Sequence, residues 1–249
     1  MKFTRLLYCS IIMAFLAVSC HWQHTLQDLT YYGDTSACRV YIEESNALVP
    51  YLVLSKEYNG NCLLVREFLL DKMQRYNNIG NPNYLGYYED SEIDVYLNND
   101  FYETLSQNIQ DMVIDSSIEI TAMNSLGVGG KDIITINRKV FLLSYAEVNG
   151  TTMLSIFLRE GRPLAFFSRK SNRIACLPSG NADNWWLRTA NTASTSLVCA
   201  VESDGVIGSG GVRAMGKDNY IGVRPAFCLE RGIPIQLEEL NGNKIYVIK

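Results

Sequence analysis

Cys20 is the residue with the clearest chemical context, because it directly follows the small and apolar residues 16–19. A cysteine in that position is typical of a lipobox, in which the thiol is acylated. Two basic residues precede an apolar run over residues 6–18, which is shorter than the roughly 20 residues that span a bilayer. We therefore predict a lipoprotein signal peptide at residues 1–19 and a lipid on Cys20.

A lipid on Cys20 would attach the protein to a membrane on its extracytoplasmic face, at the cell surface or in the periplasm. Two alternatives remain for the same segment, namely an uncleaved N-terminal anchor and ordinary cleavage without lipidation. Residues 20–36 are polar and are predicted to be a juxtamembrane spacer, followed by a single domain over residues 37–249.

Histidine, the usual general base of enzymes, is almost absent. The two histidines, His21 and His24, lie within four residues of Cys20, too close to a membrane anchor to reach a folded site. Ser-His-Asp and Cys-His nucleophile systems therefore lack a base, and a zinc site with histidine ligands is equally disfavoured. We expect no catalytic residue of these kinds, no metal and no cofactor.

The remaining cysteines show no Cys-x-x-Cys spacing, which argues against a thiol redox motif and a zinc knuckle. An exported compartment permits disulfides, and the odd number leaves at least one thiol free. Buried thiols and one or two structural bridges both remain open. The five residues concerned are Cys38, Cys62, Cys176, Cys199 and Cys228.

The charge balance is mildly acidic. Residues 1–19 carry two of the 22 basic residues and none of the 26 acidic ones, so the chain without them has a net charge of −6. No basic stripe is present to neutralise phosphates, which argues against a nucleic-acid partner. A hydrophobic content of 47% is ample for one packed core.

Turn residues between apolar runs predict hairpins that would position any site. Asn59-Gly60 separates residues 48–54 from residues 62–65, and Asn241-Gly242 joins the last two predicted strands. Residues 116–136 are predicted to be extended around a glycine loop, residues 127–131, that lacks the spacing of a phosphate-binding loop.

Two helix starts are also visible. Ser91 is a predicted N-cap for a helix whose apolar positions, 93, 97, 101 and 105, form one stripe. Ser144 and Glu147 form the S-x-x-E pattern of a capping box before a short helix. Hairpins with a few short helices between them indicate an α+β fold.

Four segments that occur in a fixed order resemble the DUF6273 family of bacterial, often surface-exposed proteins. The resemblance covers roughly residues 50–229, with Tyr96 in place of the usual tryptophan and Thr189 in place of serine. The segments are residues 95–102 (VYLNNDFY), 139–147 (KVFLLSYAE), 184–189 (NWWLRT) and 222–226 (GVRPA).

That family is distantly similar to the C-type-lectin-like fold of formylglycine-generating enzymes and diversified receptor proteins. The resemblance implies a domain of antiparallel hairpins and a few short helices, with long loops that form a binding face and with its first and last strands close together. It does not extend to oxidase chemistry, which needs two neighbouring cysteines for copper. Cys199 has no second cysteine near it in sequence, and Cys228 is a single partner at an unknown distance.

The motif residues supply the candidate ligand-binding side chains. Trp185 and Trp186 are adjacent, so on a strand they face opposite sides, one toward the core and the other available for stacking on a ligand. Arg188 is predicted to share the face of Trp186. Arg224, between Gly222 and Pro225, is predicted to be a buried structural arginine.

The leading functional hypothesis is a membrane-anchored lipoprotein whose non-catalytic domain binds a protein or a glycan. A carboxylate-dependent enzyme such as a glycosidase is an alternative, because paired carboxylates need no histidine. No pair is marked in the sequence, since Glu43-Glu44 and Glu238-Glu239 are neighbours that diverge in most conformations. A structural component of the cell envelope is the third possibility.

Overall fold

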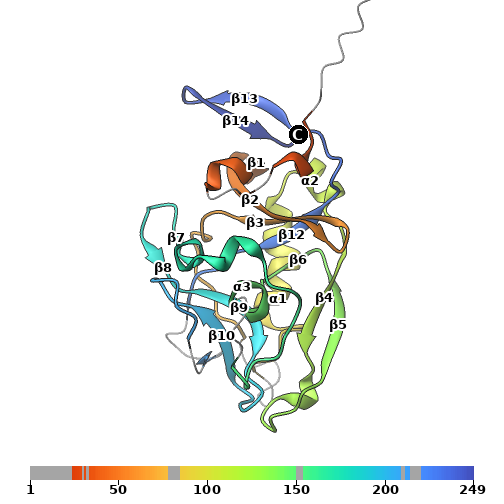
Figure 1. Cartoon of the computed structure of the whole chain (residues 1–249), viewed down its shortest axis with the longest axis vertical. Helices are drawn as coiled ribbons and strands as arrows, with labels where there is room; N and C mark the ends of the chain where they lie inside the picture. Colours follow the sequence, from red (N-terminus) through yellow and green to blue (C-terminus); the bar gives the residue numbers. More distant parts are fainter. Residues whose placement is uncertain are drawn as a thin grey trace, which may run out of the picture.

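The computed structural model of the chain describes residues 24–29, 31, 34–77, 85–149, 154–208, 211–213 and 220–249 (Figure 1). Cys20, His21 and the predicted signal peptide at residues 1–19 lie outside the described residues, so lipidation stays a prediction. The described part is a mixed α/β structure in which most elements are strands and the helices are few and short.

A seven-stranded sheet with the order β13-β14-β1-β2-β3-β12-β6 forms the upper half in Figure 1. Its neighbours are antiparallel except for β1 and β14, which run parallel, so the first and last strands of the chain lie side by side. The bounds are β1 (Arg39–Glu44), β2 (Ala47–Tyr58), β3 (Asn61–Arg66), β6 (Val140–Phe141), β12 (Ala226–Leu229), β13 (Gln236–Leu240) and β14 (Asn243–Val247).

Both predicted Asn-Gly hairpins are confirmed. Asn59 and Gly60 connect β2 to β3 with φ angles of 51° and 81°, and Asn241 and Gly242 connect β13 to β14 with φ angles of 50° and 78°. Two consecutive positive φ angles match the right-handed twist of the flanking strands, and asparagine and glycine tolerate them best.

Three smaller sheets complete the strand content of the described residues. One has the order β11-β10-β9, the second pairs β4 with β5 as predicted for residues 116–136, and the third pairs β7 with β8. The bounds are β4 (Ser116–Thr121), β5 (Ile133–Arg138), β7 (Ala175–Cys176), β8 (Ala182–Asp183), β9 (Trp185–Ala190), β10 (Leu197–Val201) and β11 (Val212–Arg213).

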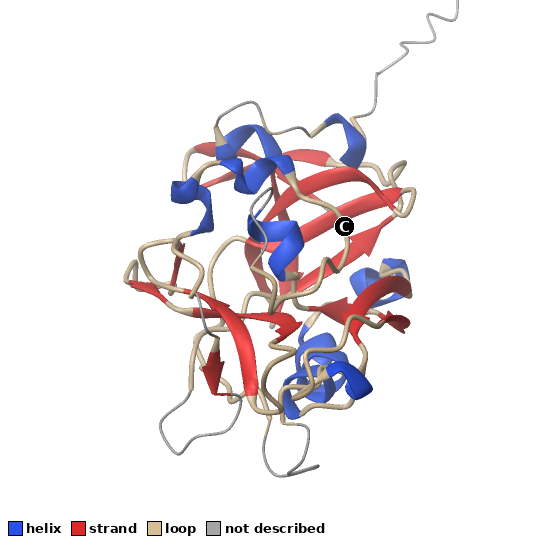
Figure 2. Cartoon of the chain, turned by 60° about the horizontal axis from the view of Figure 1, so that its bottom comes forward, coloured by secondary structure: helices blue, strands red, loops and turns tan. Residues whose placement is uncertain are grey.

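Short helical segments connect and flank these sheets (Figure 2). The α-helices are α1 (Glu92–Tyr96), α2 (Gln107–Met112) and α3 (Tyr145–Asn149). One π-helical segment is η3 (Leu97–Phe101), and the 3₁₀ turns are η1 (Leu26–Asp28), η2 (Thr35–Cys38), η4 (Tyr102–Thr104), η5 (Met123–Ser125), η6 (Ala165–Ser168) and η7 (Lys170–Arg173).

The predicted helical stripe after Ser91 is confirmed. Ser91 Oγ accepts a hydrogen bond from the backbone of Asp94 at 3.4 Å, and the helix continues from α1 directly into η3. The four apolar residues spaced by four are at most 2% exposed: Ile93, Leu97, Phe101 and Leu105. A spacing of four drifts around an α-helix, and the wider π turn returns these positions to one face.

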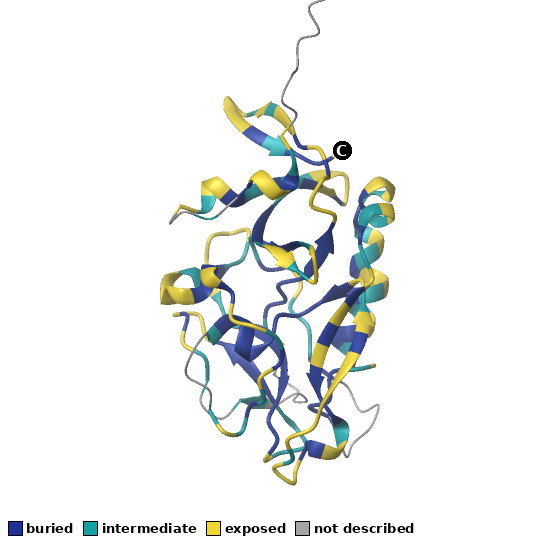
Figure 3. Ribbon diagram, turned by 45° about the vertical axis from the view of Figure 1, so that its right-hand side comes forward, coloured by how far each residue is buried: buried dark blue, intermediate teal, exposed yellow. Residues whose placement is uncertain are grey.

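Strand β9 lies inside the molecule, among the residues coloured as buried in Figure 3. Trp185 and Trp186 are both fully buried, although the sequence predicted that one of them would face solvent. Their indole N–H groups donate to the backbone oxygens of Arg173 and Gln74, each at 2.9 Å. Both faces of β9 are covered by other parts of the chain. Successive side chains of this strand therefore point into two different buried environments.

The predicted spacer, residues 20–36, is partly packed against the domain. Leu26 is fully buried and Leu29 is 6% exposed. The backbone N–H of Leu26 donates to the oxygen of Ile233 at 2.8 Å, and that of Ile235 donates to the oxygen of His24 at 2.9 Å. Apolar residues within a polar stretch therefore attach the segment from residue 24 onward to the C-terminal part of the chain.

The five cysteines after Cys20 are all free thiols in the structure. Four are buried, and the partly exposed one is Cys176. Among the described residues, no helix has both the length and the apolar character needed to cross a bilayer.

Candidate functional site

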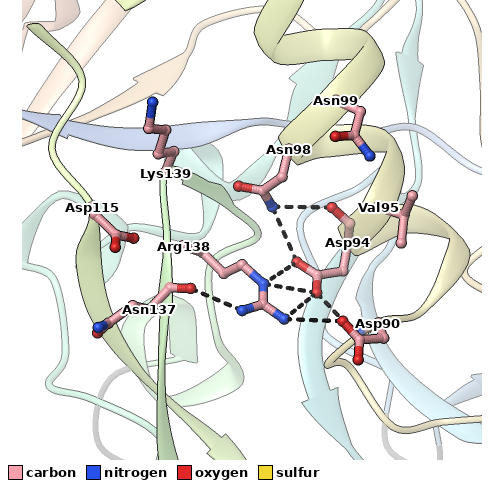
Figure 4. Close-up of a pocket in the computed structure, with 9 residues that line it drawn as sticks. All are labelled: Asp90, Asp94, Val95, Asn98, Asn99, Asp115, Asn137, Arg138 and Lys139. Carbon is pink, nitrogen blue, oxygen red and sulfur yellow. Dashed lines mark hydrogen bonds and ion pairs between the residues drawn. The ribbon is translucent and has the colours of Figure 1, made fainter. Parts of the chain in front are cut away.

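A polar cleft of about 400 Å³ lies beside the helix formed by α1 and η3 (Figure 4). Its other wall comes from the end of β5, the residue that follows it, and the residue that precedes β4. Segments about 40 residues apart in sequence thus share one hollow. The lining residues are Asp90, Asp94, Val95, Asn98, Asn99, Asp115, Asn137, Arg138 and Lys139.

The floor of the cleft is an ion pair between Asp94 and Arg138. Arg138 Nε donates to the two carboxylate oxygens of Asp94 at 3.0 and 2.9 Å, and a second guanidinium nitrogen lies 2.9 Å from Asp94 Oδ2. The Asp94 side chain is only 2% exposed, whereas that of Arg138 is 19% exposed. The third guanidinium nitrogen donates to the backbone oxygen of Asn137 at 2.8 Å, and the second also lies 3.5 Å from Asp90 Oδ1, so the guanidinium is fixed in place (Figure 4).

Asn98 joins the helix to strand β6. Its side-chain N–H₂ donates to the backbone oxygen of Val140 at 2.9 Å and to Asp94 Oδ1 at 3.2 Å. Its side-chain oxygen accepts from the backbone N–H of Val140 at 3.1 Å. Asn98 therefore pairs with Val140 as the backbone of a neighbouring strand would, which fixes the helix against the sheet.

Burial and charge oppose each other at the floor. Burial raises the pKa of the Asp94 carboxyl above its ordinary value, and the attraction of Arg138 offsets only part of this effect. Burial alone would lower the pKa of Arg138, but Asp94, together with Tyr88 and Glu89, more than offsets it, and the pKa lies above its ordinary value. The guanidinium therefore stays charged at any physiological pH.

The rim of the cleft is exposed and carries both charge signs. Lys139 Nζ donates to the hydroxyl of Tyr102 at 2.7 Å and lies 4.5 Å from the centre of the same ring. Within the described part of the chain, the side chains of Asn99 and Asp115 make no hydrogen bond. The remaining exposed rim residues are Asp90, Val95 and Asn137.

The cleft offers both hydrogen-bond donors and hydrogen-bond acceptors. Its lining contains carboxylates, amides and two cations, with no serine, cysteine or histidine. No group of three or more histidine, cysteine or acidic side chains that would hold a metal ion occurs in the described ranges. Such a lining suits reversible binding of a polar, uncharged ligand, because it can both donate to and accept from that ligand.

The residues predicted for ligand binding are not at this cleft. Trp185, Trp186 and Arg188 are at most 1% exposed, so they do not reach a ligand at the surface of this structure. Arg188 forms an ion pair with Glu147 and donates to the backbone oxygen of Leu142 at 2.8 Å. These side chains hold the interior together.

Arg224 is buried as predicted, but its partners differ from those of an ordinary structural arginine. Its Nε donates to the backbone oxygen of Arg66 at 3.0 Å, and the guanidinium lies 5.4 Å from the ring of Trp185. No carboxylate pairs with it in the described residues, and burial lowers its pKa to about 10. The rings of Trp185 and Phe167 take the place of an anion.

The residues beside Arg224 explain the rest of this motif. A Cβ atom on Gly222 would lie 2.7 Å from the backbone oxygen of Asn184 and 2.6 Å from a methyl group of Leu69, so only glycine fits there. The oxygen of Pro225 accepts from the backbone N–H of Arg66 at 2.9 Å.

Sequence reasoning did not identify the cleft, although two motif segments contain parts of it. Asn98 lies in the segment 95–102, and Arg138 directly precedes the segment 139–147 that contains Lys139. Polar residues within otherwise apolar motifs were the available signal. Their proximity depends on how the α1–η3 helix packs against β5 and β6, which no local pattern encodes.

One comparison with known proteins finds a match. The profile of the family described as "Domain of unknown function (DUF6273)" matches residues 59–231. No curated protein and no solved structure matches the chain.

The matched residues include the whole cleft. A second hollow, of about 430 Å³, lies between β1 and the β13–β14 hairpin, outside the matched range. Its lining residues are Ser36, Arg39, Tyr41, Leu240, Asn241, Asn243, Lys244, Ile245 and Tyr246. Its arginine, Arg39, donates to both carboxylate oxygens of Glu67, at 2.5 and 2.6 Å, as Arg138 does to Asp94 in the cleft. The cleft on α1 is the stronger candidate because all of its lining residues lie within the matched range.

Proposed function

This chain belongs to the DUF6273 family, and we propose that it is a membrane-anchored lipoprotein whose extracytoplasmic domain binds a glycan without catalysis. The ligand would occupy the cleft above Asp94 and Arg138. The observation that carries this proposal is a buried, preorganised ion pair beneath an exposed rim of amides and carboxylates.

The chemistry of the rim favours a glycan over a protein ligand. Carboxylate and amide side chains hydrogen-bond well to sugar hydroxyls, which are both donors and acceptors. Val95, 47% exposed at the edge of the cleft, offers an apolar surface against which the C–H face of a sugar ring can pack. A lectin-like arrangement of the domain, which the sequence motifs suggest, is consistent with this use.

The anchor would bring the domain close to the membrane. Only residues 21–23 separate Cys20 from the segment that packs on the domain through Leu26. Incorporation of radiolabelled palmitate into the wild type but not into Cys20→Ala would support the anchor, and equal labelling of the two would overturn it.

Glycan and protein arrays probed with the full chain, kept in a detergent that carries no sugar, test the ligand. We expect binding to a subset of glycans, weakened about ten-fold or more by Asp115→Asn, since a hydrogen bond to a charged group contributes about 1.5–3 kcal/mol. The matched control is Asp204→Asn, an exposed aspartate outside the cleft, which should bind as the wild type does.

Other outcomes identify the alternatives. Cleavage of a bound glycan would make the protein a carboxylate-dependent enzyme of the glycosidase kind. Binding to proteins but not to glycans would mean that the ligand of the cleft is a protein. The absence of binding on both arrays would favour a structural role in the cell envelope and overturn the proposal.

A further inference from the structure

Three unpartnered polar atoms gather at one place outside the cleft. In the described part of the chain, four buried side-chain nitrogen or oxygen atoms have no hydrogen-bond partner. Three of them are Gln74 Nε2, Arg75 Nε and Glu92 Oε2, and the fourth belongs to Arg224. Buried polar groups in folded proteins almost always have a partner, so these three atoms are places where water or the hydroxyl groups of a ligand can bind.

The backbone at this place is well fixed. The N–H of Gln74 donates to the oxygen of Ile221 at 3.1 Å, and Trp186 donates its indole N–H to the oxygen of Gln74 at 2.9 Å. Glu92 is the first residue of α1. Two of the three side chains therefore extend from positions that backbone hydrogen bonds or a helix hold in place.

The ion pair between Arg75 and Glu92 is loose. The nearest nitrogen and oxygen are 4.0 Å apart, which is too far for a hydrogen bond. The side chains are 26% and 37% exposed, so the pair lies at the surface while Arg75 Nε and Glu92 Oε2 lie beneath it.

Two tyrosines supply ring surface beside the polar atoms. The guanidinium of Arg75 lies 5.1 Å from the ring centre of Tyr220, which is 43% exposed. Tyr96 lies one turn after Glu92 and faces the side chain of Gln74; burial raises the pKa of the Tyr96 hydroxyl, and the Gln74 amide offsets part of that rise. Aromatic rings next to hydrogen-bonding side chains are suited to molecules with one apolar and several polar faces.

We propose that Gln74, Arg75 and Glu92 form a second binding site, one that takes the hydroxyl groups of a neutral, sugar-like compound. Two of the atoms donate and one accepts, and a hydroxyl group does both. Arg75 and Glu92 carry opposite charges, so the site has no net charge and gives an ion no advantage over a neutral ligand. The site shares no residue with the cleft, where α1 contributes Asp94 and Val95.

The probes are methyl α-glucoside, methyl α-mannoside and N-acetylglucosamine, with inorganic phosphate as the anionic control. They are titrated into the ¹⁵N-labelled full chain in sugar-free detergent while the Nε–H resonance of Arg75 and the fluorescence of Trp186 are recorded. We expect at least one sugar to shift the Arg75 resonance saturably, and phosphate to leave it unchanged.

Variants separate this site from the cleft. Arg75→Met and Glu92→Gln should each lower the affinity for that sugar at least ten-fold. Asp115→Asn, in the cleft, should leave the affinity for that sugar unchanged. Circular dichroism of each variant verifies that it is folded. Three results would overturn the proposal. They are an Arg75 resonance that none of the three sugars shifts, an Arg75 resonance that phosphate shifts, and a loss of sugar affinity in Asp115→Asn as large as in the site variants. None of these outcomes depends on whether the cleft binds a glycan.

Discussion

Arg188 and Glu147, which are 41 residues apart in sequence, form a two-pronged ion pair in the interior. Two guanidinium nitrogens of Arg188 lie 2.8 and 3.0 Å from the two carboxylate oxygens of Glu147, and both side chains are 0% exposed. Glu147 also accepts from the backbone N–H of Ser144 at 2.7 Å, which completes the capping box of α3. One carboxylate thus begins a helix and connects it to β9.

Removal of either partner of this ion pair should destabilise the fold. We expect Arg188→Met and Glu147→Gln each to lower the free energy of unfolding by about 3–5 kcal/mol, because the remaining charge or hydrogen-bonding group stays buried. The double variant should lose less than the sum of the two. Urea unfolding provides the measurement. Arg231→Ala, which breaks an exposed pair with Glu57, is the control and should change little. Strictly additive losses would contradict the coupling.

The titration of Asp94 should show the effect of its burial. The pKa of Asp94 is raised in the folded chain above its ordinary value of 3.8. The protonated carboxyl group therefore contributes its full stability below pH 3.8. This contribution is lost as pH rises through the folded-state pKa. The difference in unfolding free energy between wild type and Asp94→Asn should therefore fall as pH rises through that window. Carboxyl ¹³C NMR should show a raised midpoint, and Arg138→Met should raise it further. A midpoint below 3.8 would show that Arg138 outweighs burial.

The turn between β2 and β3 allows a matched comparison of two glycines. A Cβ atom on Gly60 or on Gly232 would meet nothing within 4 Å, but only Gly60 has a left-handed φ, of 81°. Gly60→Ala should cost about 1–2 kcal/mol of unfolding free energy, whereas Gly232→Ala should be neutral or stabilise by about 0.4–1 kcal/mol. Thermal unfolding of the two variants makes the comparison. Equal effects of the two substitutions would mean that the left-handed φ of Gly60 does not contribute to stability.

The segment around Leu26 should behave as part of the domain. Leu26 is fully buried, and its N–H donates to the oxygen of Ile233. Leu26→Ala should lower the unfolding free energy by about 2–5 kcal/mol, in the range of other large-to-small core changes. The neighbouring Gln27→Ala, at an exposed position, is the control. If Leu26→Ala lost no more unfolding free energy than the control, the segment would not be part of the domain and would act as a spacer, as the sequence predicted.

The thiols should differ in reactivity. Burial raises the pKa of Cys62 to about 11 and that of Cys228 to about 12, so both stay protonated and enclosed at pH 8. Cys176 is partly exposed. Among the five cysteines after Cys20, we expect a disulfide reagent to label Cys176 first in the native protein and all five after denaturation. Peptide mass spectrometry assigns the sites, and early labelling of Cys62 would contradict the burial.

Elements that depend on neighbouring residues were predictable from the sequence. Asn59-Gly60 and Asn241-Gly242 adopt the turn that their backbone freedom favours, and Ser144 with Glu147 forms the capping box that its spacing favours. The stripe that begins at Ile93 is buried along its whole length. The family was also predictable, because it depends on the order of motifs along the chain.

Contacts between distant segments were not predictable in the same way. The sequence alone determined the turns, the caps, the apolar stripe and the family. Packing between distant segments buries both tryptophans of β9, pairs Arg188 with Glu147, and places Asp94 and Arg138 at the floor of a cleft. The physical reason is that turns and caps are determined by backbone preferences over a few residues. Burial and ion pairing depend on which surfaces meet once strands and helices pack, and this is a property of the whole chain.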